Sequence, residues 1–153
     1  MIDGMKRKLV KVLAFSAVSG CASAGPKGRS VTTLTFNYTE RYIGDVVVDG
    51  AWTGGANAFG MGGGAQGLFA PSDPNRTVVL DVRWIVADVY DVASDKYSRR
   101  PDEPHRASVE VARPYPANPS YLVLHFYPDG HVEAELEADS PKRRIPPPAG
   151  YRR

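Results

Sequence analysis

The chain of 153 residues has few of the side chains on which enzyme sites depend. It contains one cysteine and three histidines, and it has neither a Gly-x-Ser-x-Gly elbow nor a His-Glu-x-x-His motif. Hydrolysis requires a nucleophile beside a base, or a metal ion with an open ligand position. We therefore expect a protein that is not an enzyme, with no catalytic residues, metal, cofactor or small-molecule substrate.

Long helical patterns are also missing. No window shows an extended apolar stripe with a period of 3.6 residues, and 13 prolines are scattered along the chain. The apolar run near the start, Leu9–Val18, is shorter than the stretch of about 20 residues that spans a bilayer as a helix. These absences predict little helix.

The first 21 residues resemble a bacterial lipoprotein signal. Four basic residues accompany the apolar run, and small residues precede the cysteine in Val18-Ser19-Gly20-Cys21. In such precursors the signal, here residues 1–20, is removed and the sulfur, here that of Cys21, is acylated. The alternative is an ordinary secretory signal, but an unmodified lone thiol is unusual in an exported protein. Ala22 and Ser23 favour an outer-membrane anchor facing the periplasm.

Three further segments follow the signal: a lipidated tether at 21–30, a β domain at 31–138 and a tail rich in proline and arginine at 139–153. The first 20 residues hold four bases and one acid, so 15 bases and 16 acids remain of totals of 19 and 17. This balance, without a nucleic-acid motif, argues against a nucleic-acid partner. The tail is expected to be extended and solvated.

Short segments with a period of two predict strands in the β domain. Val31–Thr39 and Tyr42–Asp49 are expected to pair as a hairpin. Arg76–Val86 shows the clearest alternation, with apolar residues at every second position and Asp81 and Arg83 between them.

A second hairpin is predicted further along. Ala107–Val111 forms a short strand, and Tyr121–Tyr127 then pairs with His131–Glu137 through Pro128-Asp129-Gly130, where proline presets φ and glycine accepts a left-handed conformation. About six short strands predict a mainly β fold, either an antiparallel β-sandwich or a partly open barrel, immunoglobulin-like, with little helix.

Gly54–Gly67 contains seven glycines, which predicts a mobile surface loop, because glycine loses much backbone freedom in regular structure. Trp52, Phe59, Met61 and Phe69 lie in or beside this segment. Aromatic and methionine side chains on an adaptable loop are typical interface anchors, so these four are the candidate partner-binding residues. The alternative is that Trp52 and Phe69 fold back over the open end of the sheet.

His125 and His131 lie on either side of the predicted turn, where they could approach each other and bind zinc with Glu133 nearby. Two ordinary, half-exposed sheet histidines are the more common outcome of this pattern, and we favour that interpretation.

Four segments together resemble a family of short proteobacterial lipoproteins of unknown function. They are Phe36–Ile43, Val47–Trp52 before the glycine-rich segment, Val82–Trp84 and Tyr121–Phe126. Members occur beside type VI secretion phospholipase effectors and resemble immunity lipoproteins that protect the toxin's producer. The resemblance implies a periplasmic protein that binds and neutralises a phospholipase effector, held at the membrane through lipid on Cys21. The alternative is a structural or assembly lipoprotein that binds another envelope protein or the cell wall.

Overall fold

The computed structural model describes residues 28–152, which contain β-strands and no helix. This confirms the mainly β class, and it means that no helix in these residues could cross a membrane. The predicted signal and Cys21 lie outside the described residues. The strands are β1 (Ser30–Asn37), β2 (Arg41–Val48), β3 (Ala51–Ala56), β4 (Met61–Phe69), β5 (Val79–Asp91), β6 (Lys96–Ser98), β7 (Glu103–Ala112), β8 (Tyr121–Phe126) and β9 (Val132–Glu137).

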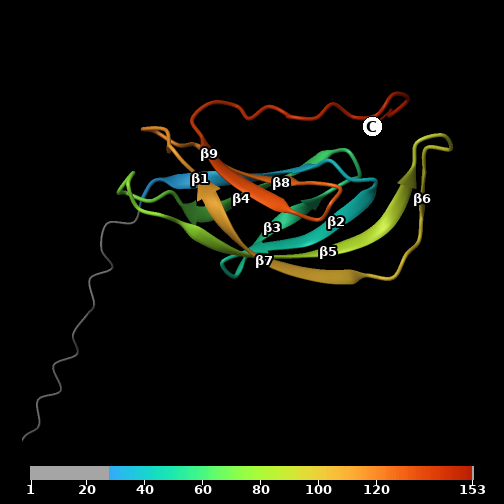
Figure 1. Cartoon of the computed structure of the whole chain (residues 1–153), viewed down its shortest axis with the longest axis horizontal. Coiled ribbons are helices and arrows are strands. Elements are labelled where there is room, and N and C mark those ends of the chain that lie inside the picture. The colour runs from blue at the N-terminus through green and yellow to red at the C-terminus, as the bar shows by residue number, and fades with distance from the viewer. Residues whose placement is uncertain (1–27, 153) are drawn as a thin grey trace, which may run out of the picture.

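The strands form one sheet that curls into a nearly closed barrel (Figure 1). Their order is β3-β2-β5-β7-β9-β8-β1-β4, and β6 pairs with β5 outside that path. Two neighbouring pairs, β1 with β8 and β7 with β9, are parallel, and the other pairs are antiparallel. The sheet is therefore mixed, and the partly open barrel is the form that the chain adopts.

The predicted hairpin of 31–39 with 42–49 is wrong. β1 pairs with β4 and β8, whereas β2 pairs with β3 and β5. Asn37 is fully buried where the two strands join, and its side-chain amide donates to the carbonyls of Arg41 and Asn57 at 2.7 and 3.0 Å. These bonds stabilise a corner at which the chain passes from one side of the barrel to the other, in place of a tight turn.

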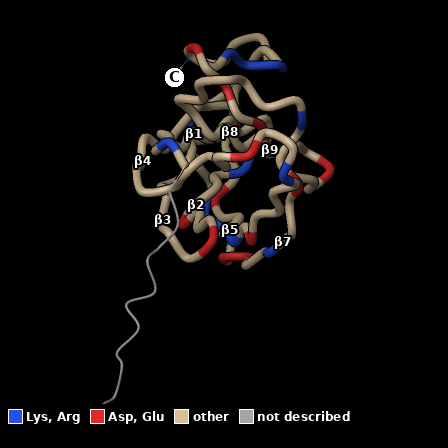
Figure 2. The backbone as a smooth tube through the Cα atoms, turned by 90° about the vertical axis from the view of Figure 1, so that its left-hand side faces the viewer, with Lys and Arg blue, Asp and Glu red and all other residues tan. Residues whose placement is uncertain are grey.

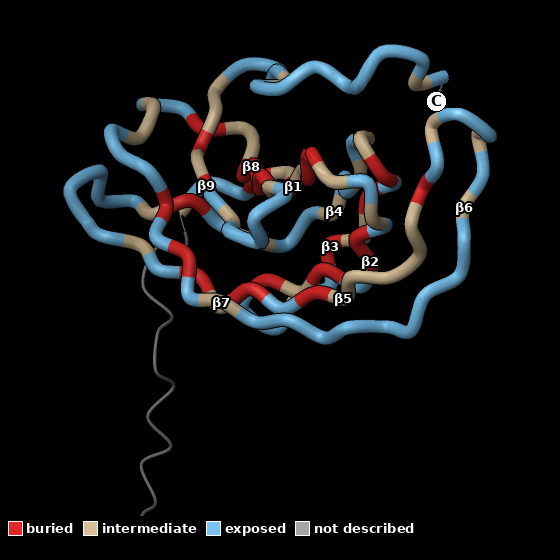
Figure 3. Tube along the Cα trace, turned by 45° about the vertical axis from the view of Figure 1, so that its right-hand side comes forward, coloured by how far each residue is buried: buried red, intermediate tan, exposed pale blue. Residues whose placement is uncertain are grey.

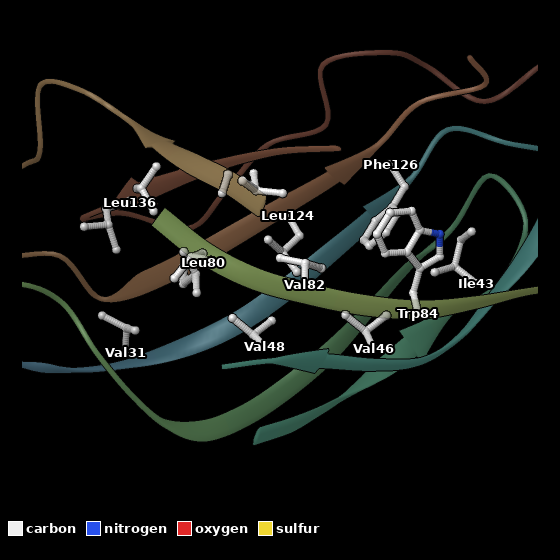
Figure 4. Packing of buried hydrophobic residues seen from close by; sticks show 14 of the residues in the cluster. Val31, Ile43, Val46, Val48, Leu80, Val82, Trp84, Leu124, Phe126 and Leu136 are labelled. Atoms are coloured by element: carbon white, nitrogen blue, oxygen red, sulfur yellow. The ribbon is translucent and has the colours of Figure 1, made fainter. Parts of the chain in front are cut away.

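Apolar side chains from both sides of the barrel fill its interior (Figure 4). β5 contributes Leu80, Val82 and Trp84, as its alternation predicts, and none is more than 6% exposed. They belong to one cluster with Leu124 and Phe126 of β8. Removal of this apolar surface from water is the main favourable contribution to folding.

The prediction of a mobile loop at 54–67 is wrong, because the segment forms the second half of β3, a turn and most of β4. Its glycines bring these two strands, which end the sheet order, backbone to backbone. A Cβ atom at Gly62 would lie 1.7 Å from the carbonyl oxygen of Gly55, and one at Gly54 would lie 3.3 Å from Cα of Gly63. Glycine is needed here for the close approach that nearly closes the barrel.

The hairpin of β8 and β9 is confirmed. The two strands pair antiparallel, from Tyr121 opposite Glu137 to Phe126 opposite Val132. Gly130 in the turn has a φ of 89°, the left-handed conformation that the Pro-Asp-Gly sequence predicts. The local turn signal is sufficient for this part of the fold.

The tail after β9 runs across the outside of the barrel (Figures 1 and 3). Most of it is exposed and without regular structure, as predicted. Two side chains nevertheless fasten it: Arg144 forms an ion pair with Glu135 at 2.7 Å, and the ring of Tyr151 packs edge-on against Phe59 and Tyr90. The tail is therefore solvated over most of its length, and the sequence did not predict the two contacts that hold it to the barrel.

Candidate partner-binding face

The structure separates the four candidate partner-binding residues. Trp52 on β3 and Met61 on β4 are 64% and 57% exposed. Phe59 lies in the turn between these strands, against the ring of Tyr151. Phe69 ends β4, about 26 Å of strand from Met61. The four do not form one cluster, and Trp52 does not fold back over the sheet.

Trp52 belongs instead to a row of side chains across the outer face of the barrel. It lies opposite Val47 of β2, Val47 lies opposite Arg83 of β5, and Arg83 lies opposite Arg106 of β7. Side chains directly opposite each other in neighbouring strands share a face of the sheet. We call these four residues, which cross β3, β2, β5 and β7, the Trp52 face.

Two arginines stand directly opposite each other in this face, an arrangement in which like charges repel. Asp81 offsets the repulsion, since its carboxylate lies 2.7 Å from Nε of Arg106 and 3.8 Å from Nε of Arg83. The arginine side chains remain 53% (Arg83) and 70% (Arg106) exposed. One carboxylate thus serves two cations, and acidic and basic positions lie side by side on β5 and β7 (Figure 2).

Trp52 is the apolar part of the face. Its Nε1 donates a long hydrogen bond to Oδ1 of Asp45 at 3.4 Å, while most of the side chain remains accessible. Tryptophan and arginine are the residues most enriched at binding hot spots, and a sheet presents them with little loss of conformational freedom on binding. The face is suited to a protein surface that offers an apolar pocket beside carboxylates.

Arg106 is the member of this face that sequence reasoning missed. The alternation in 76–86 places Arg83 on the outer side of its strand, and the structure confirms this. Arg106, in contrast, precedes the predicted strand 107–111, because β7 begins four residues earlier, at Glu103. Its position opposite Arg83 depends on the register between two strands that are not adjacent in the chain, which no local pattern reports.

On another side of the barrel, Arg144 of the tail packs with four residues of the strands and the corner after β1. We call this group of Phe36, Tyr38, His125, Glu135 and Arg144 the His125 cluster. The ring of His125 is fully buried and stacks on Phe36 and Tyr38, with centroids 5.5 and 5.8 Å away. The expectation of a half-exposed histidine is therefore wrong for His125. It is correct for His131, whose side chain is 49% exposed.

Hydrogen bonds define the protonation of His125. Glu135 is paired with Arg144 and only accepts, so Nε2 of His125 donates to it, at 2.7 Å. Nδ1 then accepts from the Tyr38 hydroxyl at 2.8 Å, and that hydroxyl accepts from the backbone N–H of Arg144 at 3.0 Å. Burial lowers the pKa of His125, and the bond to Glu135 opposes this without cancelling it. The ring is therefore neutral near pH 7.

Neither ring nitrogen of His125 is free for the zinc site that the sequence suggested. His131 points instead to Asp129 and Glu133, with nitrogen–oxygen distances of 2.5 and 3.4 Å, and the bond to Asp129 raises the pKa of His131. Within residues 28–152, the structure gathers no group of three or more His, Cys, Asp or Glu side chains that could hold a metal.

The fold defines an all-β domain whose nine-stranded mixed sheet is nearly closed into a barrel. Residues 36–134 match a family described as a protein of unknown function (DUF3304), and this match spans more than half of the chain. The chain therefore belongs to the DUF3304 family. No curated protein and no solved structure matches it. The Trp52 face and His125 lie inside the matched region, and Arg144 of the tail lies outside it.

Proposed function

We propose that this chain is an immunity lipoprotein that binds and neutralises a phospholipase effector of type VI secretion. The sequence resemblance described above motivates the proposal, and the surface of the barrel supports a binding role. One observation carries the binding role: an exposed tryptophan stands in register with two exposed, mutually opposed arginines on a sheet. Two arginines opposite each other do not favour folding of the sheet, so such a pair is expected where the residues are selected for function.

In this proposal, inhibition is steric and the chain performs no catalysis. The Trp52 face covers the mouth of the effector's active site or the surface with which the effector contacts lipid. Lipid on Cys21 holds the inhibitor at the outer membrane, facing the periplasm. Such tethering raises the local concentration of the inhibitor on the layer that the effector attacks.

The test uses the full chain and the product of a phospholipase gene adjacent to its own. Binding is measured by isothermal titration calorimetry, and residual phospholipase activity is measured in the same mixture. Formation of a stable complex with loss of activity is the expected result. Absence of a complex, or a complex with full activity, would contradict the proposal and favour the structural or assembly role with another envelope protein or the cell wall.

A further inference from the structure

The edge of β7 that faces β9 is unpaired over much of its length. β7 pairs with β5 from Glu103 to Glu110, but with β9 only at Val111 and Ala112. The first half of β7 runs past the start of β9, and no other strand among residues 28–152 pairs with it there. This half is exposed (Figure 3).

The ladder with β5 determines which backbone groups point to the unpaired side. The N–H of Val111 donates to the carbonyl of Val78 at 2.9 Å. In an antiparallel ladder every second residue bonds to the same neighbour, so the odd-numbered positions of β7 face β5. Arg106 and Ser108 therefore direct their backbone N–H and C=O groups away from β5. Pro104 offers only its carbonyl, which sets the limit of pairing at that end.

A pocket that is partly open to solvent lies beside this edge, between β7 and the turn of the β8–β9 hairpin. Its volume is about 230 Å³, and its lining combines the rings of Trp84, His105 and Phe126 with charged residues at other positions. The Trp84 ring has Phe126 edge-on at 5.3 Å and His105 stacked at 5.4 Å. Figure 4 shows Trp84, Phe126 and Ile43 together at this end of the interior. Because an apolar cavity of about 150 Å³ accepts benzene, this pocket has room for a large side chain.

The exposed charge around the pocket is acidic. Glu103 and Asp129 both line it, with side chains 53% and 68% exposed. Arg41 also lines it, but its side chain is 22% exposed and its guanidinium donates to Glu103 and to the carbonyl of Ala87. His131 lies against Asp129 and neutralises it only when protonated. Because the bond to Asp129 raises the pKa of His131, the rim favours a cation above that pKa, where the carboxylates of Glu103 and Asp129 outnumber the guanidinium of Arg41.

We propose that this opening binds an extended segment of a partner protein. The segment adds as a strand beside Arg106 and Ser108 and inserts one large apolar side chain against Trp84. A lysine or arginine next to that side chain lies close to Glu103 and Asp129. Arg106 carries a charge and Pro104 lacks an N–H, and both features limit pairing of this edge with unrelated strands. The apolar side chain and the cation of the partner segment therefore determine which segment binds. This site goes beyond the inhibitory role and does not require a phospholipase as the partner.

The first experiment selects short random peptides displayed on phage against the full chain. Enriched peptides are expected to combine a large apolar residue with a neighbouring lysine or arginine. Failure to enrich such peptides would contradict the proposal. Inhibition of a phospholipase by the same chain would be unaffected by that failure, so the two proposals are tested separately.

The second experiment measures an enriched peptide against two variants at one position. Ser108→Pro removes the outward N–H and leaves the ladder with β5 intact, whereas Ser108→Ala keeps the N–H. Affinity is expected to fall at least about tenfold for the proline variant and to be unchanged for the alanine variant. Equal affinity for the two variants would overturn strand addition.

Hydrogen exchange of the wild-type chain keeps the proposal testable if S108P fails to fold. The amides of Arg106 and Ser108 are expected to exchange rapidly in the free chain and at least about tenfold more slowly with the enriched peptide bound. Protection of these amides before the peptide is added, or no change afterwards, would overturn the proposal.

Discussion

Two regions on the outside of the barrel differ in what covers them. The tail crosses the barrel over β8 and β9 (Figure 1) and contacts Tyr38 and Glu135 through Arg144, whereas the side of β3 that carries Trp52 leaves this residue 64% exposed. In the covered region His125 has hydrogen-bond partners on both ring nitrogens. In the bare region Arg83 and Arg106 share one carboxylate and remain exposed.

The difference separates residues that stabilise the fold from residues that are available to a partner. Buried polar groups that satisfy one another contribute to stability, and removal of one leaves the others without partners. Exposed side chains on a sheet contribute little to stability, and their substitution affects binding. The two regions should therefore respond in opposite ways to substitution.

The largest effect on stability is expected for His125→Ala. This substitution leaves a cavity in a buried stack of rings and removes one hydrogen-bond partner each from Tyr38 and Glu135, so the free energy of unfolding should fall by about 3 kcal/mol or more. Urea unfolding measures the change, with His131→Ala as the matched control, expected within about 0.5 kcal/mol of wild type. Equal losses for the two variants would contradict the structural role of His125.

Arg144→Ala should have the next largest effect. Arg144 contacts Tyr127, Glu133 and Glu135, and these hydrogen bonds raise its pKa despite the opposing effect of burial. Because the network is partly exposed, we expect a loss of about 1–2 kcal/mol in the free energy of unfolding. Lys142→Ala, an exposed cation in the same tail, should leave stability unchanged. Hydrogen exchange should show the tail released only in the first variant.

Acid should destabilise the covered region as the pH falls below the ordinary histidine pKa of 6.5 towards about pH 5. The folded pKa of His125 is lowered, so below 6.5 the unfolded chain binds a proton that the folded chain excludes, and stability is lost as the pH falls. The raised pKa of His131 acts in the opposite direction, and His131→Gln removes that contribution. If the free energy of unfolding of H131Q does not change over this pH range, the lowered pKa of His125 is contradicted.

Arg83→Ala should have the smallest effect on stability, within about 0.5 kcal/mol, because it removes an exposed side chain that repels Arg106. The carboxylate of Asp81 keeps its shorter contact, with Arg106. Thermal unfolding measures this. A large loss of stability would mean that the arginine pair serves the fold.

Local patterns were sufficient for the features that depend on neighbouring residues. The alternation of Leu80, Val82 and Trp84 identifies the core face of β5, and Pro128-Asp129-Gly130 identifies the turn between β8 and β9. The exposure of Trp52 agrees with its expected position at the surface. Each of these inferences uses only residues within one strand or turn.

The features that could not be predicted depend on contacts between distant segments. The glycines at 54–67 have the composition of a loop, and only the approach of Gly62 to Gly55 shows that they close a barrel. The outward position of His125 on its strand gives no sign of burial, because the segment that covers it lies beyond β9. Arg106 joins the Trp52 face only through the register of β7 with β5.

The most direct measurement compares two variants of the full chain as inhibitors of the adjacent phospholipase. Trp52→Ala removes the large apolar side chain of the Trp52 face, and Ile145→Ala removes an apolar side chain in the tail that is 41% exposed. We expect W52A to weaken binding by about 2–4 kcal/mol with unchanged stability, and I145A to inhibit like wild type. Unchanged inhibition by W52A, or an equal loss in both variants, would contradict the assignment of the Trp52 face as the surface that binds the partner.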